Sequence, residues 1–461
     1  MNAPDAPPAP GLRAGVVSRL DSSVFGIAST APAYSLAVTV GVLAAAVGTA
    51  SPTALLLSAV PVVLVALCFR ELNRAQPDCG TAYSWAQRAL GPRTGALSGW
   101  LTITACLLVM ANLALVTAVY AFELLGAETL ADSPLARAAV GSVGIVVMAW
   151  LAYRGVQLAA RLQAVLVVIE VVALLWFAAR ALAEAERITW PTLQATGTGG
   201  VDGWSAAFLA AVFLYWGWDS SFSTNEESDD PRETPGVAAL AANGVLVVLY
   251  VVVTWAAITW AGTDRLADVA DDDFFAVLAG DLMGTTGGTV LVAAVLVSGL
   301  ASAQTTVLPT TRTLLAMGRD GVGSSRLAGI SRHGTPSTAT WVFTVASVGL
   351  YVLLVCTSEA VLWDSVAATA VLVSGYYLVT AVAALRYPYA DGVRARPLWR
   401  LVVPGLAAVV FAGVLVVSLF DLSAVSLGVV ALSLALGAPL LRARRTAPIQ
   451  SPHPTPQETR P

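Results

Sequence analysis

Long apolar runs constrain this chain more than any other feature. Because about 20 apolar residues cross the hydrocarbon core of a bilayer as a helix, each run of that length predicts one spanning helix. Hydrophobic residues make up 57% of the chain and charged residues 12%, so a soluble globular protein is excluded. The sequence predicts an all-α polytopic membrane protein with twelve transmembrane helices, at about 22–47, 53–69, 95–122, 136–153, 158–180, 204–223, 237–261, 289–316, 338–357, 361–385, 399–419 and 423–441.

The arginines predict the orientation of these helices. All 25 basic residues are arginine, and cytoplasmic loops near membrane helices are enriched in such residues. If the N-terminus is cytoplasmic, 21 arginines fall on the inner side and only Arg137, Arg180, Arg187 and Arg265 fall outside. The sequence therefore predicts a multi-pass protein of the cell membrane with both termini in the cytoplasm, and it supports an even number of spans.

Several functions are excluded by composition. A formal net charge of -4 lacks the basic excess that nucleic-acid binding requires. The four cysteines have no CxxC spacing, and both histidines, His333 and His453, lie in polar stretches. We therefore expect no metal site, no cofactor and no enzyme activity, since no intramembrane Ser/His or metal-ligand cluster exists. No obligate protein partner is evident, so the expected partners are the lipid bilayer and a small molecule.

Two of the runs contain helix-breaking features. Pro32 lies inside the first run, where it removes a backbone donor and clashes with the preceding turn. In the sixth run, Gly217 lies between Trp216 and Trp218 and is followed directly by Asp219, a charge that is costly in hydrocarbon. A spanning segment that unwinds must line a protein-enclosed or water-filled cavity. The alternative is that Pro32 only kinks its helix and Gly217 only permits close packing.

The breaks occupy matching positions, first and sixth, in two halves of five helices each. Transporters built from inverted repeats bind substrate near the midplane, where half-helix ends present free amides to an anion and free carbonyls to a cation. A zwitterionic amino acid suits both ends. The predicted organisation is a disordered cytoplasmic tail at 1–20, a first repeat at 21–185, a second inverted repeat at 186–390, two further helices at 391–442 and a disordered cytoplasmic tail at 443–461.

Four motifs, in order along the chain, resemble those of the amino acid, polyamine and organocation (APC) transporter superfamily, and within it the bacterial amino acid permeases. The resemblance implies a LeuT-like five-plus-five inverted repeat with broken helices 1 and 6. It also implies secondary active transport with a coupling ion. The motifs are STAPAYS at 29–35, QPDCGTAYSWAQRALGPRTGALSGW at 76–100, FLYWGWDSSFSTNEESDDPRETP at 213–235, and RTLLAMGRDG at 312–321 with Gly-Thr-Pro at 334–336.

The two breaks supply the predicted substrate site. We expect the amides from Thr30 to Ala33 to hold a substrate carboxylate and the carbonyls of both breaks to hold its amino group. Asp219 is expected to help bind the amino group, or else only to cap the half-helix that begins there. The two tryptophans are expected to close over the side chain. The substrate-binding residues are predicted to be Ser29, Thr30, Ala31, Pro32, Ala33, Trp216, Gly217, Trp218 and Asp219.

Ion coupling is predicted at Glu170, which lies in AVLVVIEVVALLWF and therefore deep in the bilayer. Proton-coupled relatives often have a lysine at this position, so a carboxylate reverses the charge. We expect it to exchange a proton during transport. The alternatives are a pair with an arginine, a permanently protonated packing role, or direct binding of sodium. Ser298 and Ser302, together with Gln304, are expected to lie beside the ion, or else to bond only within the protein backbone.

The predicted function is import of amino acids or related amines by proton symport with alternating access. The alternatives are an exchanger of an amino acid for its amine, and a membrane sensor that binds ligand without moving it. The acidic run after the sixth helix with Arg232, and the adjacent Arg319 and Asp320, are expected either to form ion pairs at an inner gate or to be solvated loop charges.

Overall fold

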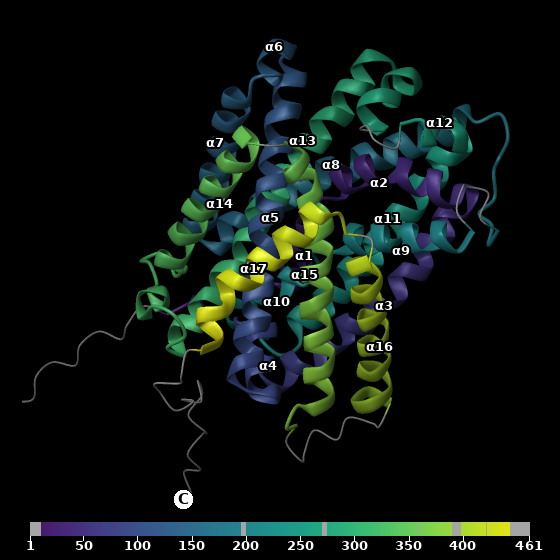
Figure 1. Cartoon of the computed structure of the whole chain (residues 1–461). Coiled ribbons are helices and arrows are strands. Elements are labelled where there is room, and N and C mark those ends of the chain that lie inside the picture. Colours follow the sequence, from purple (N-terminus) through teal and green to yellow (C-terminus); the bar gives the residue numbers. More distant parts are fainter. Residues whose placement is uncertain are drawn as a thin grey trace, which may run out of the picture.

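The chain folds as a bundle of helices (Figure 1). The computed structural model describes residues 11–194, 200–269, 274–357, 359–389, 398–420 and 422–442. Within these ranges the regular elements are all helices, apart from two isolated β-bridges. Nine segments of the described chain are long and apolar enough to cross a membrane. The protein is therefore a multi-pass helical membrane protein.

The long helices coincide with the predicted apolar runs, because the runs are uniformly apolar and their ends are set by proline, glycine or charge. Their bounds are α3 (Ser51–Ala75), α5 (Pro92–Leu124), α7 (Pro134–Tyr153), α8 (Val156–Glu184), α11 (Thr234–Ala261), α13 (Phe274–Arg319), α14 (Ser337–Thr357), α15 (Glu359–Arg386), α16 (Val403–Phe420) and α17 (Ala424–Arg442).

Shorter elements lie between these helices, and the sequence analysis did not predict them. Their sequences are too short or too polar to cross a membrane, so a search for spanning runs passes over them. One of them, α4, packs on α5 and α15 and buries Tyr83, Trp85 and Gln87, with the Trp85 ring edge-on to Phe69 of α3. The elements are α4 (Ala82–Leu90), α6 (Glu128–Ala131), α12 (Thr263–Ala267), the 3-10 turns η1 (Gly48–Ala50), η2 (Asn225–Glu227) and η3 (Ser325–Ala328), and the π-helical turn η4 (Leu398–Val402).

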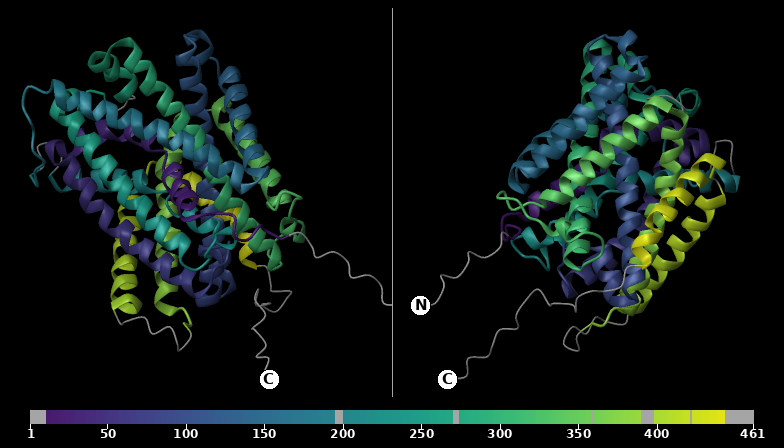
Figure 2. Two further views of the ribbon diagram at one scale, coloured as in Figure 1. Left: turned by 180° about the vertical axis from the view of Figure 1, so that it is seen from behind. Right: turned by 60° about the vertical axis from the view of Figure 1, so that its left-hand side comes forward.

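The helix α13 runs through the centre of the bundle. It packs against α5, α8, α7 and the first two helices of the chain, and its backbone is non-helical at Gly284. At the edge of the bundle, α16 and α17 pack on α15 (yellow in Figure 2). The buried polar residues of α13 are thereby placed next to the interrupted helices.

The first apolar run is interrupted where the sequence predicts a break. The helix α1 (Arg19–Ser29) ends before Thr30, and α2 (Pro32–Val47) begins after Ala31, whose φ of 47° is left-handed. Pro32 does not kink a continuous helix. It is the first residue of α2, where a missing N–H leaves no bond unmade and its fixed φ suits the helix. The strained position is therefore Ala31.

The sixth run is interrupted as well. The helix α9 (Gly200–Tyr215) ends before Trp216, and the short α10 (Ser220–Ser223) follows. Gly217 has a φ of 126°, and a Cβ there would lie 2.6 Å from the carbonyl carbon and oxygen of Ser29. The two interruptions therefore touch, although about 190 residues separate them in sequence.

Candidate functional site

A small cavity of about 40 Å³ lies where the two interruptions meet. It has room for only a few water molecules, so a larger ligand requires the surrounding side chains to move. The predicted substrate-binding residues that line it are Ser29, Thr30, Ala31, Trp216, Gly217 and Asp219, and the predicted ion-coupling residue Ser302 lines it as well. The other lining residues come from α2, α5, α9, α13 and α15: Tyr34, Ser35, Thr102, Cys106, Val109, Leu113, Phe213, Thr306, Pro309 and Tyr376.

Asp219 is the only charged residue among those that line the cavity. Its Oδ2 accepts a 2.7 Å hydrogen bond from the hydroxyl of Tyr376, which in turn accepts one of 2.6 Å from Nε1 of Trp216. The expected capping role is not observed, since Asp219 precedes α10 but its side chain makes no capping bond. The carboxylate is instead held by α15 and turned to the cavity, where a cation is its natural counterpart.

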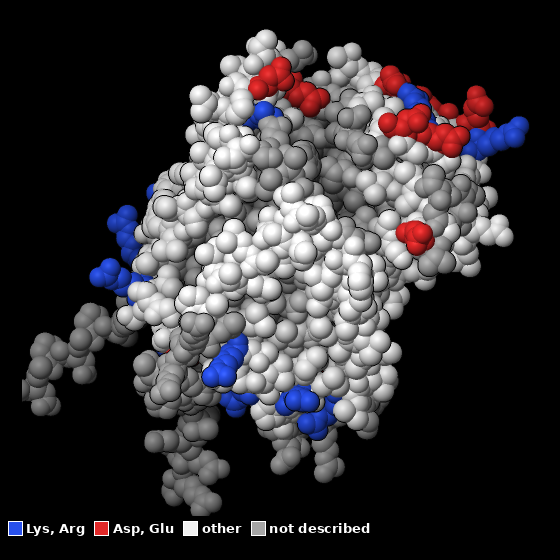
Figure 3. All heavy atoms as spheres, in the orientation of Figure 1, with Lys and Arg blue, Asp and Glu red and all other residues white. Residues whose placement is uncertain are grey.

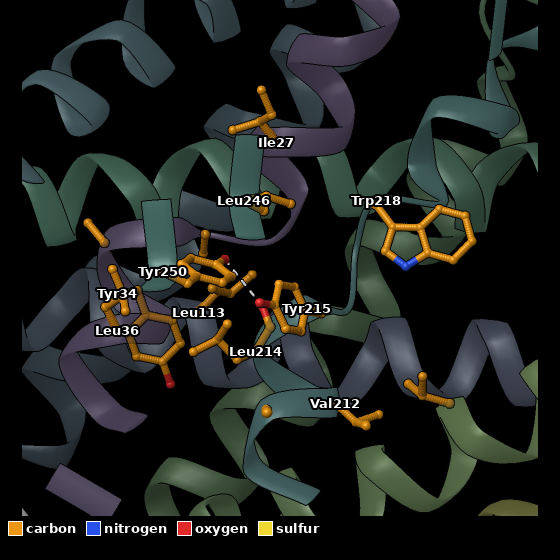
Figure 4. Packing of buried hydrophobic residues seen from close by; sticks show 14 of the residues in the cluster. Ile27, Tyr34, Leu36, Leu113, Val212, Leu214, Tyr215, Trp218, Leu246 and Tyr250 are labelled. Carbon is orange, nitrogen blue, oxygen red and sulfur yellow. Dashed lines mark hydrogen bonds between the residues drawn. The ribbon is translucent and has the colours of Figure 1, made fainter. Parts of the chain in front are cut away.

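Tyr250 of α11 joins the two interruptions. Its hydroxyl lies 3.2 Å from the Thr30 hydroxyl and 3.3 Å from the carbonyl oxygen of Leu214, the latter contact being drawn in Figure 4. On the opposite side, the Ser302 hydroxyl donates a 2.9 Å hydrogen bond to the Ser29 carbonyl. The carbonyl of Ser29, the last residue of α1, is thus hydrogen-bonded to α13, and Ser302 lies beside the first interruption.

The amides of the first interruption are already engaged. Those of Thr30 and Ala31 donate to the carbonyls of Ile27 and Ala28, at 3.2 and 3.1 Å. Pro32 has no N–H, and neither Pro32 nor Ala33 lines the cavity. From the sequence we expect the amides from Thr30 to Ala33 to be available to a substrate carboxylate. In this conformation the amides of Thr30 and Ala31 are not available, because the last turn of α1 tightens and they bond carbonyls of that helix.

The two tryptophans lie in different surroundings. Trp216 lines the cavity, whereas Trp218 is fully buried behind it. The Trp218 ring stacks on Tyr377 at 5.7 Å and meets Phe69 edge-on at 5.3 Å, and in Figure 4 it points away from Tyr250. The turn at Gly217 separates the two side chains. A wall over the substrate is therefore available from Trp216, and Trp218 belongs to the packing of the bundle.

Glu170 is fully buried on α8, outside the cavity lining. Its carboxylate faces the Ser298 hydroxyl and the backbone amide of Ala33, the second residue of α2. No ion pair between Glu170 and an arginine is found in the described part of the chain, so the alternative of an arginine pair is not observed there. Gln163 lies about two turns before Glu170 on α8, and its side-chain amide donates hydrogen bonds to Gln304 and to the Ala301 carbonyl of α13. The carboxylate thus lies at the junction of α8, α2 and α13, facing the positive end of α2.

Ion pairs close one end of the bundle below the cavity. Arg312 binds Glu227 at 2.6 Å, and both side chains are buried, with 2% and 0% exposed. Arg319 binds Glu226 at 3.0 Å. Burial raises the pKa of Glu227, and the charge of Arg312 opposes that rise. Of the acidic run after α10, Glu226 and Glu227 are therefore paired, whereas Asp229 and Asp230 are exposed.

The predicted partners in this region were partly different. Asp320 accepts a 2.9 Å hydrogen bond from Tyr83 of α4 and does not pair with the adjacent arginine. The sequence points to Arg232 as a partner here, whereas the residues that make the contacts are Arg312, Tyr250 and Tyr376. Arg312 can be recognised from the sequence, because it is a lone arginine near the end of an apolar run. Tyr250 and Tyr376 cannot be recognised in this way, because tyrosine is common in buried helices and only the packing shows which hydroxyls reach the breaks.

A polar cavity between two interrupted helices of a multi-pass helical protein is typical of membrane carriers of small molecules. A family model described as amino acid permease matches residues 22–433. The chain therefore belongs to the amino acid permease family of the APC superfamily. This confirms the resemblance drawn from the sequence motifs.

Three proteins of known activity are similar to this chain. The branched-chain amino acid permeases of Lactococcus lactis subsp. cremoris (strain MG1363) and Bacillus subtilis (strain 168) are 26% and 27% identical, over 64% and 62% of this chain. The matches span 66% and 63% of those proteins. A methylthioribose transporter of Bacillus subtilis (strain 168) is 23% identical over 73% of this chain and 74% of its own length. All three relatives are membrane carriers of small molecules.

Proposed function

We propose that this protein is a secondary active transporter that imports an amino acid or a related amine across the cytoplasmic membrane by proton symport. The proposal rests chiefly on one observation, the polar cavity between two contacting interruptions with the Asp219 carboxylate turned into it. Half-helix ends and a buried charge near the middle of a bundle are the features by which carriers of this kind bind small polar solutes.

The proposed topology has twelve spans in a five-plus-five inverted repeat. In it, α1 with α2 and α9 with α10 are the broken first and sixth spans, residues 21–185 and 186–390 are the repeats, and α16 and α17 follow. Both termini are cytoplasmic. The arginine distribution supports this orientation. In Figure 3 most of the acidic side chains in view gather over α6 and α12 with a few basic ones among them, and the other basic side chains lie at the left and lower edges.

The proposed substrate pose uses both interruptions. The substrate ammonium is placed at Asp219 and the carbonyl of Ser29, with Trp216 closing over the side chain. Its carboxylate takes the amides near Thr30 and Ala31 once these release their bonds to α1. The apolar lining from Val109, Leu113 and Phe213 suits an aliphatic side chain, in keeping with the branched-chain substrates of two relatives.

The proposed coupling group is Glu170, with Ser298 and Ser302 around the ion. An ionised Glu170 is attracted to the N-terminal end of α2 through the Ala33 amide. Protonation removes that attraction and frees α2 to shift relative to α8. Since α2 follows directly from the first interruption, proton binding and the shape of the substrate cavity are linked in this scheme. The ion pairs of Arg312 and Arg319 then close the inner side and part when it opens.

Uptake by proteoliposomes tests the proposal. A panel of labelled amino acids and amines is offered with and without an imposed pH gradient, to the unaltered protein and to Glu170→Gln. We expect accumulation above equilibrium only with the gradient, and facilitated flux without accumulation in Glu170→Gln. Full gradient-driven accumulation by the variant would disprove the role of Glu170. Dependence on a sodium gradient alone would assign the coupling to sodium, and a need for internal counter-substrate would indicate an exchanger. Absence of any flux would reject transport.

A further inference from the structure

A second cavity, of about 210 Å³, shares no lining residue with the substrate cavity, and basic side chains are among those that line it. Three segments form it: the residues before α1, the turn from α7 into α8, and the turn from α13 into α14. In the proposed topology all three are cytoplasmic. The lining residues are Arg13, Arg154, Gly155, Val156, Gln157, Leu158, Arg161 and His333.

Backbone and side-chain contacts hold these segments together. The Thr335 hydroxyl donates a 2.8 Å hydrogen bond to the carbonyl of Tyr153, which joins the turn before α14 to the end of α7. The side chain of Arg13 packs on Gly334, where a Cβ would lie 2.5 Å from its Cγ. Val17 exchanges backbone hydrogen bonds of 3.0 Å with Glu227 and Asp229. The cavity is therefore a built feature of the fold.

The guanidinium group of Arg154 lies over the Trp150 ring, at 4.9 Å, and that of Arg13 donates a 3.5 Å hydrogen bond to the carbonyl of Arg332. No ion pair from Arg13, Arg154 or Arg161 to a carboxylate is found in the ranges that the structure describes. Desolvation and the positive charges of Arg332, Arg154 and Arg13 lower the pKa of His333. The first turn of α8, a helix of 29 residues, also faces this cavity, and no side chain caps its amides. Three guanidinium groups and free helix amides together call for an anion with several oxygen acceptors.

Membrane-facing side chains lie next to the cavity. Trp150 and Trp341 are 44% and 42% exposed, and Tyr153 contacts both His333 and Trp341 at ring distances of 5.7 and 5.9 Å. Aromatic residues of this kind mark the interface between membrane and water. From there the exposed apolar face of α8 continues into the span through Leu158. The cavity is thus at headgroup level, with an apolar surface for acyl chains below it.

We propose that this cavity binds the phosphate of an anionic phospholipid, with Arg13, Arg154 and Arg161 around the phosphate and the acyl chains along α8. Basic pockets between membrane helices on the cytoplasmic side are suited to such headgroups. The bound lipid joins the segment before α1 to the α7–α8 turn. Since that segment leads into the interrupted first span and is bonded to Glu227 of the inner ion pair, lipid binding stabilises the closed inner side.

Lipid binding to the purified full-length protein in detergent tests the proposal without any transport assay, so its failure is separate from failure of the proposed function. Native mass spectrometry measures retention of phosphatidylglycerol or cardiolipin against phosphatidylcholine. We expect the double variant Arg154→Gln/Arg161→Gln to bind the anionic lipids about 25-fold more weakly, at about fivefold for each arginine lost. The matched control is Arg326→Gln, an exposed arginine of η3, which is expected to bind as the unaltered protein does.

Three outcomes would overturn the proposal. One is equal retention of phosphatidylcholine and the anionic lipids, and another is an equal loss of binding in Arg326→Gln, which would indicate general surface charge. The third is displacement of the lipid by millimolar inorganic phosphate with equal thermal stabilisation, since the ligand would then be free phosphate. Selective retention that falls only in the double variant supports the lipid site.

Discussion

The hydroxyl of Tyr376 on α15 donates a 2.7 Å hydrogen bond to Oδ2 of Asp219, directly after the interruption of the sixth apolar run. This bond fixes the only charged group of the cavity lining and links it to a helix that has no break of its own. Tyr376 therefore holds the Asp219 carboxylate in the orientation that the proposed substrate pose uses.

Removal of this bond tests the proposed role of Asp219. In Tyr376→Phe the carboxylate loses a donor, and hydrogen bonds to charged groups contribute about 1.5–3 kcal/mol. We expect uptake efficiency to fall about tenfold or more, with Asp219→Asn at least as impaired. Initial uptake rates over a range of substrate concentrations measure this. Tyr377→Phe is the control, since that ring packs against Trp218 outside the cavity. Unchanged kinetics in Tyr376→Phe would contradict the proposed pose.

The two tryptophans around Gly217 should respond differently to the same substitution. Trp216→Phe removes the donor to Tyr376 and is expected to raise the apparent KM with little change in thermal stability. Trp218→Phe leaves a void in the packed aromatic group and is expected to lower the melting temperature while KM stays unchanged, since Nε1 of Trp218 has no hydrogen-bond partner in the described structure. The reverse pattern would show that Trp218 contacts substrate.

Gly217 is expected to tolerate no side chain. A Cβ there would lie 2.6 Å from the Ser29 backbone, and the φ of 126° disfavours any L-residue. Gly217→Ala should therefore separate the two interruptions and reduce uptake at least tenfold, even where expression and size-exclusion profiles remain normal. Gly244→Ala, in the middle of α11 with nothing within 4 Å of its Cβ, should leave uptake intact. Equal activity of the two variants would show that contact between the breaks is dispensable.

The buried pair of Arg312 and Glu227 predicts a strongly non-additive pair of substitutions. Arg312→Met alone leaves a buried carboxylate without its partner and should cost about 3–5 kcal/mol of stability. Glu227→Leu alone leaves the buried guanidinium of Arg312 without its partner, and we expect a similar loss of stability. The double variant, with neither charge, should recover most of the loss in melting temperature. Additive losses in a double-mutant cycle would indicate that the two charges contribute independently.

A pH-dependent effect on stability is expected at Asp78, in the turn before α4. Burial and the charge of Glu226 raise the pKa of Asp78, so its ionised form destabilises the folded state. Asp78→Asn, which keeps an acceptor for the Gly80 amide and the Ser84 hydroxyl, should therefore melt at a higher temperature than the unaltered protein at alkaline pH. The difference should shrink as the pH falls through the raised pKa toward the value of about 3.9 for a free side chain. Melting curves across this range measure it, and a difference that grows on acidification would reverse the assignment.

The sequence by itself determined where the helices run and which two of them break. Apolar length acts locally, because a water-exposed run of this length is energetically unfavourable. Pro32 and Gly217 mark the two breaks because each disfavours a regular helix at its own position, although Pro61, Pro309 and Pro439 lie inside continuous helices. The same local chemistry identified Asp219 and Glu170 as unusual, because a charge inside an apolar run is costly wherever the chain folds.

Only the tertiary structure decided what those residues face. Rotation about the turn at Gly217 sends Trp216 to the cavity and Trp218 to the packed interior. Packing of α15 and α11 brings Tyr376 and Tyr250 to the breaks, across about 160 and 220 residues of sequence respectively. Membrane helices are nearly equal in hydrophobicity around their circumference, so the sequence pattern does not fix which face turns inward. That rotation is set by the close fit of neighbouring helices, and it chooses the partners of every buried polar group.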